Sequence, residues 1–150
     1  MHVKIILRAI VTLALAILFG FSAHAQDTKL TLVVVDGRNG KPMPAQRLLV
    51  FVVESQDDVR LHKDSLDVTT DKDGVAILAI THANIQWIQV FIDFRTLCQS
   101  KPNLQSFNVG EIVLSGMATP NTCGVFRRDV APSHLIVFAR PATLREKMDW

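Results

Sequence analysis

The chain has 150 residues, of which 49% are hydrophobic, and its sixteen basic and fourteen acidic side chains leave a formal net charge of +2. This length allows one domain of ordinary size, or one domain after a targeting segment, and excludes a two-domain enzyme. Only 20% of the residues are charged, and they form no basic stripe. The composition therefore argues against nucleic acid as a partner.

The first 25 residues have the pattern of a secretory signal peptide. Two basic residues precede an apolar run over Ala9–Phe19, and small residues at 23 and 25 form a cleavage site. The alternative is an uncleaved membrane anchor, although the run is shorter than the roughly 20 residues that a spanning helix needs. Cleavage between Ala25 and Gln26 would leave a formally neutral domain over residues 26–150, secreted or periplasmic, with no integral membrane span.

The predicted mature chain reads as short β-rich segments separated by turn clusters, with no internal helix. A short C-terminal helix is expected after Pro141, because Thr143-Leu144-Arg145-Glu146 has the spacing of a capping box. Seven strands at this spacing predict an all-β, antiparallel β-sandwich. The expected strands, in chain order, are Leu30–Val35, Arg47–Glu54, Leu66–Thr70, Val75–Ile80, Ile85–Phe94, Val109–Leu114 and His134–Ala139.

The two cysteines, Cys98 and Cys123, both lie in the predicted mature chain. Export favours oxidation, and a single pair permits a single connectivity, so we expect a structural disulfide. The alternative is a redox or metal-binding pair. It lacks support, because the sequence has no Cys-x-x-Cys motif and no histidine within several positions of either cysteine.

Three segments carry motifs of a known family. Residues 34–44 (Val-Val-Asp-Gly-Arg-Asn-Gly-Lys-Pro-Met-Pro) are similar to the opening of carboxypeptidase regulatory-like domains. Residues 69–75 (Thr-Thr-Asp-Lys-Asp-Gly-Val) resemble their second hallmark, and residues 109–114 resemble their late strand. The resemblance implies a seven-stranded, transthyretin-like (prealbumin-like) Greek-key sandwich with a non-catalytic role in exported proteins. The sequence departs from the pattern at Ala45-Gln46, where these domains have a glycine-led pair.

Residues suited to catalysis are scattered. The transthyretin-like hydroxyisourate hydrolases resemble one another in a C-terminal Tyr-Arg-Gly-Ser, whereas this chain has no tyrosine and ends Lys-Met-Asp-Trp. The histidines of the predicted mature chain, His62, His82 and His134, are isolated from one another, which disfavours a metal site. We expect no catalytic residue, metal ligand or cofactor. The rival hypothesis is a small envelope hydrolase in which folding brings His82 and His134 together.

Two further segments offer ligand hypotheses. Asp71 and Asp73 supply oxygens for calcium, but no glutamate follows at the required distance, so a plain turn is the better interpretation. Trp87 and Phe91 share a strand face with Gln89 and form a possible ligand surface for sugars or peptides. The alternative places both aromatic residues in the core.

The favoured interpretation is an exported, non-enzymatic binding or interaction module. Sheet edges can pair with other chains, so protein partners or self-association are expected. The alternative function is a carbohydrate-contacting or structural surface protein.

Overall fold

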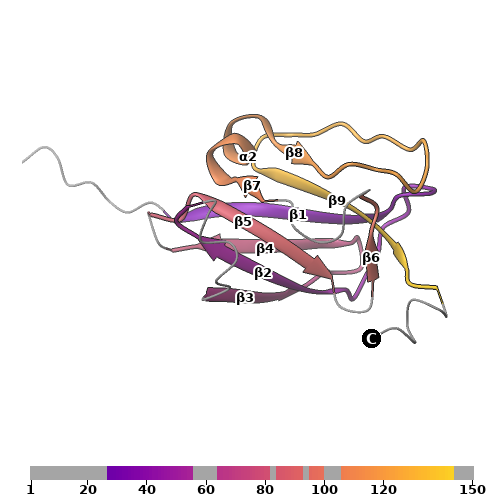
Figure 1. Cartoon of the computed structure of the whole chain (residues 1–150), viewed down its shortest axis with the longest axis horizontal. Helices are drawn as coiled ribbons and strands as arrows, with labels where there is room; N and C mark the ends of the chain where they lie inside the picture. The colour runs from indigo at the N-terminus through magenta and orange to yellow at the C-terminus, as the bar shows by residue number, and fades with distance from the viewer. Residues whose placement is uncertain (1–26, 56–63, 82–83, 93–94, 100–105, 144–150) are drawn as a thin grey trace, which may run out of the picture.

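The computed structural model of the chain describes residues 27–55, 64–81, 84–92, 95–99 and 106–143 (Figure 1). These residues form two β-sheets and one short helix, so the fold is mostly β, as predicted. The expected signal peptide and nearly all of the expected C-terminal helix lie outside the described residues. Within these ranges no helix is long and apolar enough to cross a membrane.

The first sheet has the strand order β4-β1-β9-β6, with β8 also paired to β9, and the second sheet has the order β3-β2-β5-β7. In chain order the elements are β1 (Thr28–Asp36), β2 (Arg47–Val53), β3 (Asp64–Thr69), β4 (Val75–Ile80), β5 (Trp87–Ile92), β6 (Arg95–Leu97), β7 (Phe107–Asn108), α2 (Val109–Ser115), β8 (Met117–Ala118) and β9 (His134–Pro141). Six of the seven predicted strands are therefore present among the described residues, whereas β6, β7 and β8 were not expected.

The main core lies between the two sheets. Successive side chains of a strand point to opposite faces, so every second residue of a strand enters this core. In β4 this alternation is plain: Ala76, Leu78 and Ile80 are buried, whereas Ile77 and Ala79 are exposed. Strands of both sheets contribute, and so does α2. The buried members include Leu30, Leu32, Val34, Leu48, Val50, Val52, Ile88, Val90, Ile92, Phe107, Ile112, Leu135 and Val137.

A second, smaller core covers the outer face of the first sheet. Val33 and Val35 of β1 and Ile136 and Phe138 of β9 are buried there beside Cys98. In Figure 1 the segment after α2, which includes β8, runs above β9 and covers this face. β1 and β9 are thus buried on both sides over their central residues, which explains the apolar runs 32–35 and 135–139.

The pairing of β1 with β9 corrects the prediction of a fully antiparallel sandwich. The two strands run parallel, with Thr31 opposite His134 and Asp36 opposite Ala139. β8 and β9 are also parallel. Alternation and strand length do not reveal strand direction, whereas two-sided burial is typical of parallel pairs.

The predicted strand at Val109–Leu114 is wrong, because this segment is the helix α2. Asn108 is its N-cap and accepts a hydrogen bond from the Glu111 backbone at 3.0 Å. Gly116 ends the helix with a φ of 71° and donates its N–H to Ile112. The part of the family resemblance that treats residues 109–114 as a late strand is therefore wrong as well.

Candidate binding surfaces

One edge of the first sheet is formed by β4, which pairs with β1 alone among the described strands; the other is the three-residue strand β6. Its sequence, Val-Ala-Ile-Leu-Ala-Ile, contains no charge and no proline. Ile77 is 57% exposed on this strand, although it is a large apolar residue. Natural sheet edges are commonly protected by charges, prolines or bulges, because an unpaired strand can add another chain. β4 has neither a charge nor a proline.

One hydrogen bond shows which backbone groups of β4 face the open edge. The Val34 N–H donates to the Gly74 carbonyl at 2.8 Å, so these residues form a hydrogen-bonded pair between β1 and the start of β4. Hydrogen-bonded pairs recur at every second residue of an antiparallel ladder. Ala76 and Leu78 therefore point their backbone groups toward β1, and Ile77 points its N–H and carbonyl away from it.

The backbone N–H and carbonyl groups of Val75 and Ala79 also point away from β1, but those of Val75 already form hydrogen bonds. Its N–H donates to Asp71 Oδ1 at 2.9 Å, and its carbonyl accepts the Asp71 backbone N–H at 2.8 Å. The two residues of β4 whose backbone groups face the open edge without this capping are therefore Ile77 and Ala79.

The edge of the second sheet differs from β4 in its charge. β3 carries Asp64 and Asp67, both exposed. Arg47 on the neighbouring β2 forms an ion pair with Asp67 at 2.9 Å, which places further charge on this sheet near its edge. These carboxylates protect β3 in the way typical of natural edge strands, so β4 is the better candidate for strand addition.

The ligand surface predicted at Trp87 and Phe91 lies on the outer face of the second sheet. Both side chains are partly buried, so they form neither a fully exposed ligand surface nor a part of the buried core. On β2, Phe51 lies opposite Gln89, between the two aromatic residues. The rings of Phe51 and Phe91 meet edge to face, with centroids 5.3 Å apart and planes at 89°. These two rings are not coplanar, so they do not form a flat stacking platform.

Gln89 is the unexpected residue of this face. Its side chain is 1% exposed, and neither Oε1 nor Nε2 has a hydrogen-bond partner in the described part of the chain. An unpaired buried amide costs about 1–3 kcal/mol of stability. The sequence indicated the face on which Gln89 lies but not its burial, because burial of one strand position depends on neighbours from other strands.

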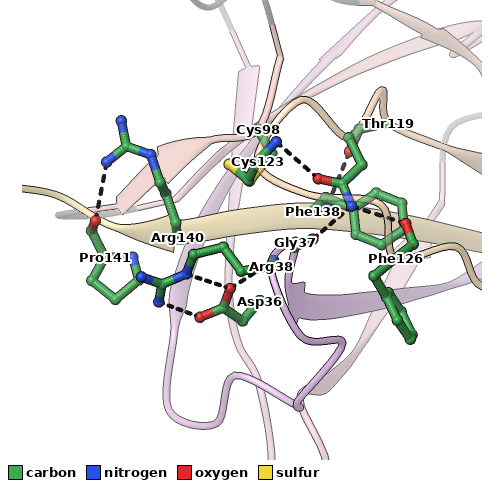
Figure 2. The surroundings of a disulfide bond; sticks show 11 residues. Asp36, Gly37, Arg38, Cys98, Thr119, Cys123, Phe126, Phe138, Arg140 and Pro141 are labelled. Atoms are coloured by element: carbon green, nitrogen blue, oxygen red, sulfur yellow. Dashed lines mark hydrogen bonds and ion pairs between the residues drawn. A yellow bond between two sulfur atoms is a disulfide. The ribbon is translucent and has the colours of Figure 1, made fainter.

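The predicted disulfide between Cys98 and Cys123 is present, with Cα atoms 5.2 Å apart (Figure 2). It fastens the segment after β8 to the outer face of the first sheet. Two backbone bonds support the attachment: Cys98 donates to the Phe138 carbonyl at 2.9 Å, and Thr122 donates to the Cys98 carbonyl at 2.8 Å. The pair therefore has the surroundings of a structural crosslink.

Asn121 orders the same segment, although no motif in the sequence singles it out. Its Nδ2 donates to the carbonyls of Gly37 and Phe126 at 2.7 and 2.9 Å, and its Oδ1 accepts the Cys123 N–H at 3.1 Å. The ring of Phe126 packs so closely on Gly40 that a Cβ there would lie 2.2 Å from a ring carbon. Over β1 and β9 this outer face is therefore filled by the protein's own chain.

A carboxylate–guanidinium pair closes the turn after β1. Arg38 donates from Nε and Nη2 to both carboxylate oxygens of Asp36, at 3.0 and 2.5 Å (Figure 2). The side-chain hydrogen bond from Arg38 is the main cause that holds the pKa of the Asp36 carboxyl below its ordinary value. Because its partner neutralises Arg38, the pair is a structural feature rather than a free anion site.

Asp71, the first ligand in the calcium hypothesis, forms hydrogen bonds within the turn before β4. Asp71 Oδ1 accepts the backbone N–H groups of Asp73 and Val75, both at 2.9 Å, which is the geometry of a plain turn. His134 Nδ1 lies 2.8 Å from the Pro132 carbonyl, and His62 and His82 lie outside the described residues. Within the described ranges, no group of three or more His, Cys, Asp or Glu residues could hold a metal ion.

Comparison with protein-family models and with curated protein sequences found no match to this chain.

Proposed function

We propose that this protein is an exported, non-enzymatic binding module with a transthyretin-like Greek-key sandwich. Its strand connections support the fold assignment. β2 and β3 pair in the second sheet before β4 returns to pair with β1 in the first, and β5 then pairs with β2. This alternation between sheets is the connectivity that Greek-key sandwiches use. The disulfide supports an oxidising, extracytoplasmic location.

The observation that carries the binding role is the open edge of β4. Its strand is neutral, its Ile77 side chain is 57% exposed, and the backbone groups of Ile77 and Ala79 point away from the sheet. An extended segment of a protein partner would complete the ladder there, with its backbone supplying affinity and its alternate side chains supplying specificity. The proposed ligand is therefore a protein strand added to this edge.

Affinity capture from the envelope fraction tests this role with three forms of the mature protein. The wild type is compared with Ile77→Lys, which places a charge on the edge, and with Val125→Lys, which changes a side chain that is 93% exposed elsewhere. We expect a captured protein that the Ile77 variant loses and the Val125 variant keeps. Equal capture by all three forms would refute binding through β4.

A carbohydrate-contacting role is the second candidate, and it depends on Trp87. This side chain remains partly exposed beside the buried, unpaired amide of Gln89. A sugar would stack on the exposed part of the indole, because the Gln89 amide is buried out of reach of a surface ligand. Titration of the protein with oligosaccharides by isothermal calorimetry, repeated on Trp87→Ala, separates the two candidates. A saturable binding heat that is lost in the variant would favour carbohydrate over protein.

A further inference from the structure

We infer that the strand added to β4 is β4 of a second copy of this chain, antiparallel to the first, about a two-fold axis that passes through Leu78. This inference rests on the proposed binding role of the edge and names the partner. It follows from the spacing of the available backbone groups, the side chains on each face and the charge of the strand.

The backbone spacing is self-complementary. Ile77 and Ala79 each present one N–H and one carbonyl to the open edge, and they are two residues apart. A two-fold axis at Leu78 places Ile77 opposite Ala79 of the second copy and Ala79 opposite Ile77 of that copy. Each pair exchanges both of its bonds, so the available groups of both strands are used.

A neighbouring register is less satisfactory. An axis at Ile77 would pair Ala79 with Val75 of the second copy. Both backbone groups of Val75 are bonded to Asp71, so that pair would lose its hydrogen bonds or open the turn before β4. The occupied turn therefore selects the Leu78 register over this one.

The side chains of the Leu78 register match on both faces. On the outer face the exposed Ile77 would pack against the small side chain of Ala79 from the second copy. On the inner face Leu78, at the axis, is already buried in the main core of its own copy, so no exposed polar or charged side chain is brought together there. No charge of β4 opposes another charge, whereas two copies of β3 would bring its carboxylates together.

Cysteine crosslinking of the purified mature protein tests both the partner and the register. In this register Ile77 and Ala79 of the other copy form a directly opposed pair, whose Cα separation of about 5.5 Å suits a disulfide. Identical residues lie on a diagonal at roughly 7–8 Å, which is too far for easy bridging. A mixture of Ile77→Cys and Ala79→Cys proteins should therefore form a covalent dimer under mild oxidation, and each variant alone should form much less.

The matched control is a mixture of Ser65→Cys and Asp67→Cys, which has the same spacing on the β3 edge, where both residues are exposed. No more dimer from the β4 mixture than from this control would overturn the inference, as would equal crosslinking of each single variant. Capture of a different protein that depends on Ile77, without crosslinking, would refute self-pairing while leaving the proposed function intact. Loss of both results would refute the proposed function too.

Discussion

Removal of the disulfide is the perturbation whose effect the structure defines best. In a Cys98→Ala, Cys123→Ala double variant, the segment after β8 keeps its hydrogen bonds to the sheet but loses its covalent attachment. Cys98 is 1% exposed within the smaller core, so the change also removes a buried sulfur from the cluster that contains Val33, Val35 and Ile136. We expect the fold to survive, because the main core between the sheets does not include the pair.

The magnitude follows from the sequence separation of 25 between the two cysteines. In the chain-entropy model, closing a loop of this length stabilises the folded state by about 3.5 kcal/mol. For a domain of roughly 125 residues, one kcal/mol corresponds to a change in Tm of about 4 °C, so the Tm should fall by about 14 °C. The measurement is thermal and urea denaturation followed by circular dichroism.

The part of the structure that loses stability is as informative as the size of the change in Tm. The wild type in reductant should unfold at the same temperature as the double variant. Hydrogen exchange should increase first at the Thr122 N–H, which donates to the Cys98 carbonyl, and at the Cys98 N–H, which donates to Phe138. A Tm unchanged within about 3 °C, or faster exchange confined to the second sheet, would refute the structural role of the disulfide.

Three further substitutions test individual contacts by urea denaturation. Gln89→Met should stabilise the protein by about 1–2 kcal/mol, because it removes a buried, unpaired amide while keeping the side-chain length. Gly40→Ala should destabilise it by about 2–3 kcal/mol, because Gly40 has a φ of +72° and its Cβ would meet the ring of Phe126. Asp36→Asn should destabilise the protein at neutral pH, because it removes the carboxylate that accepts two bonds from Arg38.

The Asp36 result has a defined pH dependence. The pKa of this carboxyl is lowered in the folded protein, so its contribution is complete above the unfolded pKa of about 3.9 and is lost as the pH falls through the folded pKa. The stability difference between wild type and variant should therefore shrink in acid; a difference independent of pH would contradict the ion pair. Gly110→Ala, on the exposed side of α2, is the control for Gly40: its Cβ would lie 3.1 Å from Asn108 Oδ1 and meet no ring or backbone, so it should cost less than Gly40→Ala. A destabilised Gln89→Met variant would show that its amide has a partner.

The helix α2 shows why an apolar run alone does not distinguish a strand from a short helix. Ile112, Val113 and Leu114 read as a strand because consecutive apolar residues fit either a buried strand or a short helix. The deciding signals flank the run: Asn108 three residues before Glu111, and Gly116 at the end. These capping residues were available in the sequence, so this error was avoidable.

The edge position of β4 was not available in that way. The strand Val75–Ile80 was predicted at its exact bounds, and Asp71 to Gly74 correctly predicted the turn before it. Which strand ends a sheet depends on pairings between distant segments, such as β1 with β9, which local patterns do not encode. Only the sheet order therefore shows that β4 lies at an edge. The burial of Gln89 likewise depends on side chains from other strands.

Amide hydrogen exchange along β4, measured residue by residue at several protein concentrations, tests the role of this edge most directly. In dilute protein, Ala76 and Leu78 should be protected by their bonds to β1, whereas Ile77 and Ala79 should exchange rapidly. As the concentration rises, Ile77 and Ala79 should become protected together, while Ala76 and Leu78 change little. Rapid exchange of Ile77 and Ala79 at every concentration would contradict pairing with a second copy, and protection of both in dilute monomer would contradict an open edge at β4.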